Sequence, residues 1–241
     1  MKVYGLLGAH LSHSFSKKFF TDFFAANKLP YRYQLFEFWH IEDFFEQINT
    51  IKNLEGFNVT IPYKEKVIPF LDSLSPEAKA VGAVNCVKKV NNRLIGYNTD
   101  IFGFEKTIVP LQLKNCQALI LGTGGAAKAV AYVLKQKAIT FHFVSEHPEQ
   151  NKAFSYEALW DKNIRDYSLI INATPLGMYP QTDSFPKIPY WHLTPKHIVI
   201  DLVYNPVKTE FLSRAEKQKA TIINGMTMLK NQALKSWEIW E

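Results

Sequence analysis

The chain has 241 residues, 47% of them hydrophobic and 21% charged, a composition typical of a folded globular protein that excludes general disorder. Since domains average about 150 residues, this length fits one large domain or two smaller ones. The 28 basic residues outnumber the 22 acidic ones, giving a net charge of +6. The lysines are scattered, so we expect a solvated surface that attracts anionic small molecules, and no nucleic-acid partner.

The sequence also predicts no membrane partner and no metal site. Its longest apolar runs fall far short of the roughly 20 residues that span a bilayer, and its first residues are not typical of a signal peptide. Cys86 and Cys116 are the two cysteines, too few for a disulfide framework or a zinc site. We therefore expect a cytoplasmic enzyme or binding protein.

The first hundred residues alternate between short β-rich apolar runs and segments of helical period, which indicates βα units. Ser14 or Ser16 can cap a first helix, whose phenylalanines form an apolar stripe that we assign to the core. A second helix is expected around 44–51. Strands are expected at 3–7, 31–38, 57–61, 83–90 and 93–97, the last two joined by a tight turn at Asn91-Asn92.

The second half repeats the strand and helix alternation and predicts a second α/β domain. A helix is expected at about 100–109, followed by a buried strand at 117–121 that ends on glycine. The remaining elements are expected as an alanine-rich helix at 126–138, strands at 139–144, 169–172 and 198–202, a helix at 209–218, a strand at 221–223 and a final helix at 226–240.

A glycine loop, Gly122-Thr123-Gly124-Gly125-Ala126, stands between a predicted strand and a predicted helix. In this context backbone N–H groups and the start of the helix can approach a pyrophosphate. Two adjacent glycines followed by two alanines at a helix entry favour dinucleotide binding over the alternative, a tight turn without a ligand.

Ribose recognition is expected at the end of the next strand, where an acidic residue binds the 2′-hydroxyl and an arginine favours a 2′-phosphate. Glu146 stands there, 24 positions after Gly122 (146 − 122). Its carboxylate would repel a 2′-phosphate, and His147 and Lys152 would partly offset that repulsion. A solvated loop carboxylate is the alternative interpretation of Glu146.

Polar motifs at the ends of several predicted elements, each of them a turn or cap signal by itself, form an ordered set. They are Ser14-Phe15-Ser16, Asn58-Val59-Thr60-x-Pro62-x-Lys64, Gly82-Ala83-Val84-Asn85, Asn98-Thr99-Asp100, the glycine loop, Asn172-Ala173-Thr174-Pro175-x-Gly177-Met178, Asp201-x-x-Tyr204-x-Pro206 and Gly225-Met226-Thr227-Met228-Leu229-x-x-Gln232. In this order they resemble the motifs of the shikimate dehydrogenase family over essentially the whole chain.

The resemblance implies an α/β fold of two domains that face each other across a cleft. The substrate-binding domain would be discontinuous, comprising residues 1–100 and 225–241, and residues 101–224 would form a Rossmann-like dinucleotide-binding domain. The implied activity is that of an NADP-dependent oxidoreductase of aromatic amino acid (chorismate) biosynthesis. It transfers a hydride reversibly between the nicotinamide and C3 of 3-dehydroshikimate, which yields shikimate.

The resemblance also implies roles for individual residues. Lys64, paired with Asp100, would supply and remove the proton on the reacting oxygen. The substrate carboxylate and ring oxygens would be bound by Ser14, Ser16, Thr60, Asn85, Tyr204 and Gln232. The cofactor would be bound by Gly122, Gly124, Gly125, Ala126, Glu146, Thr174, Met178, Leu202 and Gly225.

Three positions depart from the family pattern. Lys17 replaces a proline, Leu202 replaces a methionine of similar volume, and Glu146 stands where NADP-preferring members have arginine. The family favours NADP, and Glu146 leaves NAD open. The alternatives are an NAD-dependent quinate/shikimate dehydrogenase and a non-catalytic metabolite-binding module, and either a monomer or a homodimer fits the sequence.

Overall fold

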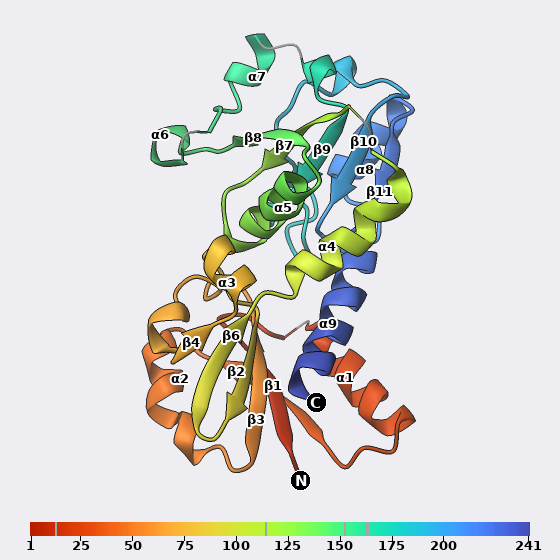
Figure 1. Cartoon of the computed structure of the whole chain (residues 1–241). Coiled ribbons are helices and arrows are strands. Elements are labelled where there is room, and N and C mark those ends of the chain that lie inside the picture. The colour runs from red at the N-terminus through yellow and green to blue at the C-terminus, as the bar shows by residue number, and fades with distance from the viewer. Residues whose placement is uncertain (13, 114, 152, 162–163) are drawn as a thin grey trace. The chain divides into compact units, whose positions relative to one another are not determined.

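The computed structural model describes residues 1–12, 14–113, 115–151, 153–161 and 164–241. It divides into two compact units. Unit 1 comprises Met1–Thr99 and Ala233–Glu241, and unit 2 comprises Asp100–Gln232. Each unit contains one sheet with helices packed on it (Figure 1). The predicted α/β fold class is therefore confirmed.

Unit 1 is built on a six-stranded mixed sheet in the order β2-β1-β3-β5-β6-β4. Strand β1 lies between β2 and β3 and is parallel to both, and β5 is antiparallel to β3 and β6. Asn91 and Asn92 have φ angles of 50° and 64° and form the expected hairpin turn. The strands are β1 (Val3–Gly8), β2 (Arg32–Glu37), β3 (Leu54–Val59), β4 (Ser73–Leu74), β5 (Cys86–Val90) and β6 (Arg93–Tyr97).

Both faces of this sheet are covered by helices, because side chains alternate along each strand. In β1, Tyr4 and Leu6 join an aromatic cluster with α1 (Phe15–Ala26) and the end of α9 (Met226–Trp240). Val3 and Leu7 point to the opposite face, which α2 (Ile41–Gln47) and the 3₁₀ turn Ile48–Thr50 cover. Phe20 and Phe24 of the predicted apolar stripe are buried in the core.

Three elements between β3 and β5 were not expected from the sequence. A 3₁₀ turn at Ile68–Phe70 leads into β4, which pairs with β6, and α3 (Pro76–Val81) follows. The Ser75 hydroxyl caps α3 by accepting a hydrogen bond from the Ala78 N–H at 3.2 Å. A serine followed by proline at the first helical position is a recognisable helix start, so α3 had a sequence signal.

Unit 2 is built on a five-stranded sheet in the order β11-β10-β9-β7-β8, and all of its pairs are parallel. This is a doubly wound order with a reversal between β7 and β9, where such sheets bind ligands at the carboxyl ends of the strands. The strands are β7 (Gln117–Leu121), β8 (Thr140–Val144), β9 (Leu169–Asn172), β10 (Ile198–Asp201) and β11 (Thr221–Ile223).

Helices cover both faces of the second sheet as well (Figure 1). The core of one face includes α4 (Asp100–Ile108) and α5 (Gly125–Gln136), and that of the other includes α8 (Glu210–Lys217). The remaining short helices are α6 (Pro148–Asn151), α7 (Ala158–Asp161) and 3₁₀ turns at Val109–Leu111, Ile164–Asp166 and Tyr190–His192. None of the described helices is both long and apolar enough to cross a bilayer.

The division between the units falls inside α9, eight residues after position 225 where we expected it (233 − 225). The first turns of α9 belong to unit 2 because Met228 packs in the same cluster as Phe104 of α4. Its last turns belong to unit 1 because Trp237 and Trp240 pack in the aromatic cluster with Tyr4. Gln232 is therefore the last residue of unit 2.

Candidate functional site

The two serines expected to bind the substrate carboxylate lie at the start of α1. Ser14 occupies the N-cap position, but its hydroxyl makes no capping bond, so the expected capping role is wrong for this residue. The Ser14 Oγ is buried and has no hydrogen-bond partner among the described residues. Ser16 lies near Tyr33 and lowers the pKa of this phenol, against the larger effect of burial. Since buried hydroxyls are normally bonded, Ser14 Oγ is suited to a polar ligand.

A buried hydrogen-bond network lies behind Ser16. Burial raises the pKa of Tyr33 well above its usual value, and this neutral phenol donates to Asn58 Oδ1 at 2.8 Å. Asn58 Nδ2 donates in turn to the Ser236 hydroxyl of α9 at 2.8 Å and to the Asn85 carbonyl at 3.1 Å. The network therefore ties β2, β3, α9 and the segment before β5 together.

Asn85, an expected substrate residue, is oriented by its contacts with the segment that precedes α4. Its Oδ1 accepts hydrogen bonds from the Thr99 N–H at 2.6 Å and the Thr99 hydroxyl at 3.1 Å. The Thr99 hydroxyl also contacts the Ser236 hydroxyl at 3.2 Å. Only 3% of Asn85 and 1% of Thr99 is exposed, so the amide orientation is fixed by buried partners.

Thr60 and Lys64 follow β3 at the carboxyl edge of the unit 1 sheet. The Thr60 N–H donates to the Leu7 carbonyl of β1 at 2.9 Å, and the Thr60 carbonyl accepts from the Tyr63 N–H at 2.8 Å. This turn carries Lys64, whose side chain is partly exposed and whose carbonyl accepts from the Val84 N–H at 2.7 Å. Hydrogen bonds to Leu7 and Val84 thus fix the backbone at the start of the turn and at Lys64. Lys64 therefore lies at this edge of the sheet.

Asp100 and Gln232 belong to unit 2. Asp100 is the first residue of α4 and only 4% exposed, and Gly103, one turn later, lies against Met228 and Gln232 of α9. Within unit 2 the packing of α4 on α9 therefore brings the segments that carry Asp100 and Gln232 together. The pairing of Lys64 with Asp100 joins the two units and stays a prediction.

The glycine loop lies at the carboxyl end of β7, at the reversal of strand order. Gly122 has a φ of 103°, a conformation that favours glycine, and its N–H donates to the Val144 carbonyl at 2.8 Å. Gly124 is the N-cap of α5, and a side chain there would meet no atom within 4 Å. The first turn of α5 carries no acidic residue. Its unpaired N–H groups and open approach fit a pyrophosphate.

The loop after β9 borders the glycine loop on the other side of the reversal. A Cβ on Gly122 would lie 2.9 Å from Thr174 Cγ2, and the Ala173 N–H donates to the Leu121 carbonyl at 2.9 Å. Met178, further along this loop, is 40% exposed. Two expected cofactor residues, Thr174 and Met178, thus lie on the segment beside the glycine loop.

Gly225 and Leu202 are also in direct contact. A Cβ on Gly225 would collide with the Leu202 carbonyl, so only glycine fits this position. Tyr204, an expected substrate residue, lies two positions beyond Leu202 and is half-buried. The turn after β10 therefore carries one expected cofactor residue and one expected substrate residue.

At the end of β8 the structure places Glu146 in solvent. Its neighbour Ser145 is 7% exposed, and the Ser145 hydroxyl accepts a hydrogen bond from the His147 N–H at 3.0 Å. This turn orients Glu146 and His147 outward. Lys152, the other cation considered for this place, lies outside the described residues.

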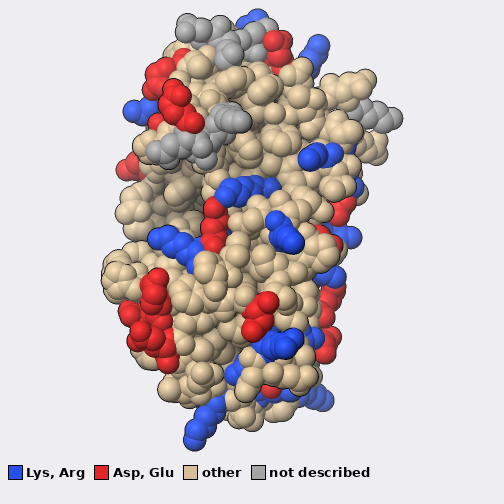
Figure 2. All heavy atoms as spheres, turned by 60° about the vertical axis from the view of Figure 1, so that its left-hand side comes forward, with Lys and Arg blue, Asp and Glu red and all other residues tan. Residues whose placement is uncertain are grey.

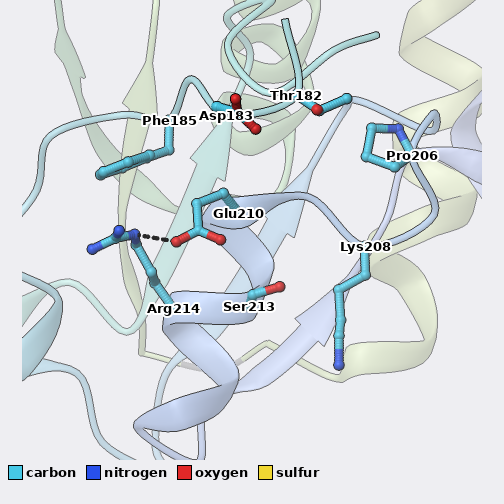
Figure 3. A pocket seen from close by; sticks show the side chains of 8 residues that line it. All are labelled: Thr182, Asp183, Phe185, Pro206, Lys208, Glu210, Ser213 and Arg214. Carbon is cyan, nitrogen blue, oxygen red and sulfur yellow. Dashed lines mark ion pairs between the residues drawn. The ribbon is translucent and has the colours of Figure 1, made fainter. Parts of the chain in front are cut away.

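A pocket of about 490 Å³ in unit 2 contains none of the expected site residues (Figure 3). Arg214 of α8 pairs with Glu210 at 2.8 Å, and its guanidinium lies 3.9 Å from the centre of the Phe185 ring. Lys208 pairs with Glu216. The contact between Arg214 and Phe185 attaches the loop at 182–185 to α8, and we assign the pocket a structural role.

The face shown in Figure 2 carries no single basic region among the described residues. On the face in Figure 2, the described basic side chains are interspersed with acidic ones. Among the described residues, no group of three or more His, Cys, Asp or Glu side chains could hold a metal ion.

Three side chains that the sequence did not single out, Tyr33, Ser236 and Thr209, hydrogen-bond to the motif residues Asn58 and Asp201. Tyr33 and Ser236 read as ordinary strand and helix positions, and the sequence gives no signal that Asn58 bonds to both. Thr209 had a recognisable signal, because a threonine directly before a helix is a typical N-cap.

Comparison with known proteins gives a consistent family assignment. The family model described as the shikimate dehydrogenase substrate binding domain matches residues 6–87. A shikimate dehydrogenase (NADP(+)) of Clostridium beijerinckii is 38% identical, covering 100% of this chain and 92% of that protein.

Two solved structures agree over the whole chain. A chorismate mutase/shikimate 5-dehydrogenase fusion protein from Clostridium acetobutylicum is 36% identical with a TM-score of 0.89, covering 100% of this chain and 91% of that chain. Shikimate 5-dehydrogenase from Thermus thermophilus, in complex with NADP(H) and shikimate, is 28% identical with a TM-score of 0.88, covering 100% and 93%. The identity and coverage together show that this chain belongs to the shikimate dehydrogenase family.

Proposed function

We propose that this chain is a shikimate dehydrogenase, an oxidoreductase that reversibly reduces 3-dehydroshikimate to shikimate with NADP(H) in aromatic amino acid biosynthesis. The structural observation that carries the proposal is the carboxyl end of β7 and β9, where the strand order of the unit 2 sheet reverses. There a glycine loop suited to a pyrophosphate lies against the Thr174 loop. Full-length relatives that bear this name and bind NADP(H) and shikimate support it.

Unit 1, with the last turns of α9, would be the substrate-binding part, and unit 2 the dinucleotide-binding part. Support comes from the family model, which matches residues 6–87 within unit 1. Shikimate carries one carboxylate and several hydroxyls, so its pocket needs short hydrogen-bonding groups. The unpartnered Ser14 hydroxyl would meet the carboxylate, with Ser16 and Tyr204. Thr60, Asn85 and Gln232 would contact the ring oxygens.

The proton at the reacting oxygen would be handled by Lys64. Reduction places negative charge on the carbonyl oxygen at C3, and an ammonium within hydrogen-bond reach stabilises this charge and donates the proton. In the reverse direction the neutral amine removes the alcohol proton. Asp100 would hold the Lys64 ammonium in place. NADP, when bound, supplies the group that exchanges the hydride.

The cofactor preference rests on the end of β8. The curated relatives are named for NADP(+), and His147 and the net positive charge of the chain support an anionic 2′-phosphate. The exposed carboxylate of Glu146 favours NAD as the second candidate, because it would repel that phosphate and could instead accept a bond from a 2′-hydroxyl. The cytoplasmic location and the choice between monomer and homodimer stay predictions.

Steady-state oxidation of shikimate with NADP, with NAD in parallel and quinate as a second substrate, tests this proposal. Turnover of shikimate with NADP is expected. Preferential turnover of quinate with NAD would replace the proposal with the quinate/shikimate alternative. A folded protein that binds shikimate but shows no turnover with either cofactor would support the non-catalytic binding module.

A further inference from the structure

Asp201, at the carboxyl end of β10, is a fully buried carboxylate that no proposed reaction step uses. It accepts three hydrogen bonds. Asn172 Nδ2 and the Val203 N–H donate to its Oδ1, both at 3.0 Å. The Thr209 hydroxyl donates to its Oδ2 at 2.5 Å. Each of these donors belongs to a different segment of unit 2, so Asp201 connects three segments.

The first bond leads to the loop after β9. Because a carboxylate only accepts, Asp201 fixes the amide of Asn172 with its NH₂ group toward β10. The amide oxygen then accepts from the Thr174 N–H at 3.0 Å and the Thr174 hydroxyl at 2.6 Å. The same NH₂ group donates to the Leu176 carbonyl at 3.3 Å. The position of Thr174 therefore depends on Asp201 through one amide.

The second bond leads to the turn after β10 and to Gly225. The N–H of Val203 is held by Asp201, and the carbonyl of Val203 accepts from the Gly225 N–H at 3.1 Å. Leu202 lies between Asp201 and Val203 in the sequence, and its N–H donates to the Asn172 carbonyl at 2.9 Å. The close approach of Gly225 to Leu202 thus occurs within a turn anchored at both ends.

The third bond leads to α8. The Thr209 hydroxyl donates to Asp201 and accepts from the Leu212 N–H at 3.3 Å, as the N-cap of the helix. Thr209 therefore satisfies the second carboxylate oxygen and fixes the start of α8 against the end of β10.

We propose that Asp201 is a positioning residue for the cofactor, which acts through Asn172 and Val203 to place Thr174, Leu202 and Gly225. This inference rests on the proposed function, since the cofactor roles of those three residues do. It explains why a charged group is buried here. Burial raises the pKa of Asp201 to about 6, and the pKa of Tyr190 nearby is raised by burial and, to a lesser extent, by the charge of Asp201. Burying an uncharged side chain here would cost less free energy of folding. Only a carboxylate, however, can accept hydrogen bonds from all three donors.

The test is NADPH binding by Asp201→Asn, measured by fluorescence titration at pH 8. The amide preserves the volume but removes the charge, so the bonds that Oδ1 accepts from Asn172 and Val203 lose their charge assistance and the NH₂ group can only donate toward Thr209. We expect the Kd for NADPH to rise about tenfold, the loss of one charge-assisted hydrogen bond. The melting temperature should not fall, and the KM for shikimate should change less than the Kd for NADPH, because Tyr204 is the one proposed substrate residue on the turn that Asp201 holds. Asp183→Asn, an exposed carboxylate of the same unit, is the matched control and should behave as wild type.

Two further variants keep the inference falsifiable if Asp201→Asn does not fold. Asn172→Ala cuts the link to Thr174 and should weaken NADPH binding similarly, and Thr209→Ser keeps the hydroxyl and should preserve it. Wild-type NADPH affinity in Asp201→Asn or in Asn172→Ala overturns the inference, as does a loss shared equally with shikimate binding and the melting temperature. A wild-type protein that binds no NADP(H) overturns the proposed function as well, which distinguishes the two failures.

Discussion

Replacing Asp201 with Asn should change how the stability of unit 2 depends on pH. Burial raises the pKa of Asp201 from its usual 3.8 to about 6, although the hydrogen bonds from Thr209, Val203 and Asn172 oppose the shift. One pKa unit corresponds to about 1.4 kcal/mol, so the difference corresponds to about 3 kcal/mol. Because the folded state holds the proton more tightly, this stabilisation is complete below pH 3.8 and is lost as the pH rises through about 6.

The variant lacks this titration, so its free energy of unfolding should rise relative to that of wild type as the pH increases. Roughly 2 kcal/mol of the difference should develop between pH 4 and pH 7. His197, whose pKa burial lowers, titrates in both proteins and cancels in the comparison. The assay is urea unfolding of both proteins at several pH values, with hydrogen exchange of peptides from β10 as a readout specific to unit 2. Parallel pH profiles for the two proteins would refute the reasoning.

Four further substitutions test individual residues. Lys64→Ala should lower kcat about 100-fold or more while NADPH still binds. The control, Lys66→Ala at an exposed position, should leave kcat unchanged. An unchanged kcat in Lys64→Ala would remove Lys64 from the mechanism. Glu146→Arg should raise the ratio of kcat/KM with NADP to that with NAD about tenfold, by adding a charge-assisted contact to the 2′-phosphate; an unchanged ratio would show that Glu146 takes no part in this selection. Ser14→Ala should raise the KM for shikimate about tenfold. Its free energy of unfolding should stay within about 0.5 kcal/mol of wild type, because the Ser14 hydroxyl has no partner among the described residues. A loss of stability without a change in KM would contradict the assignment. Trp240→Ala should lower the free energy of unfolding, measured by urea titration, by about 3–5 kcal/mol. The side chain is only 3% exposed, and its indole N–H donates to the Val87 carbonyl at 2.9 Å. A loss below about 1 kcal/mol would show that Trp240 is not part of the packed core.

The elements with continuous apolar patterns could be predicted from the sequence. The run at 118–121 is fully buried in β7, and a glycine loop and an alanine-rich helix follow it as expected. Strand β4 could not be predicted, because two residues are too short for any periodicity to show.

The supporting contacts of the candidate site were less accessible to sequence reasoning. A serine at a helix start is a good cap, and nothing local shows that the Ser14 hydroxyl leaves its own helix uncapped. Asn58 and Ser236 are 178 positions apart, so their bond follows from the return of α9 to the first sheet. The division of α9 between two cores likewise depends on which partners Met228 and Trp237 find.

The central claim is that this chain transfers a hydride from C3 of shikimate, and isotope transfer tests it most directly. Shikimate labelled with deuterium at C3 would be oxidised with NADP, and the reduced cofactor examined by mass spectrometry. We expect NADPH one mass unit heavier than that formed from unlabelled shikimate. Unlabelled NADPH, or no NADPH from folded protein, would contradict it.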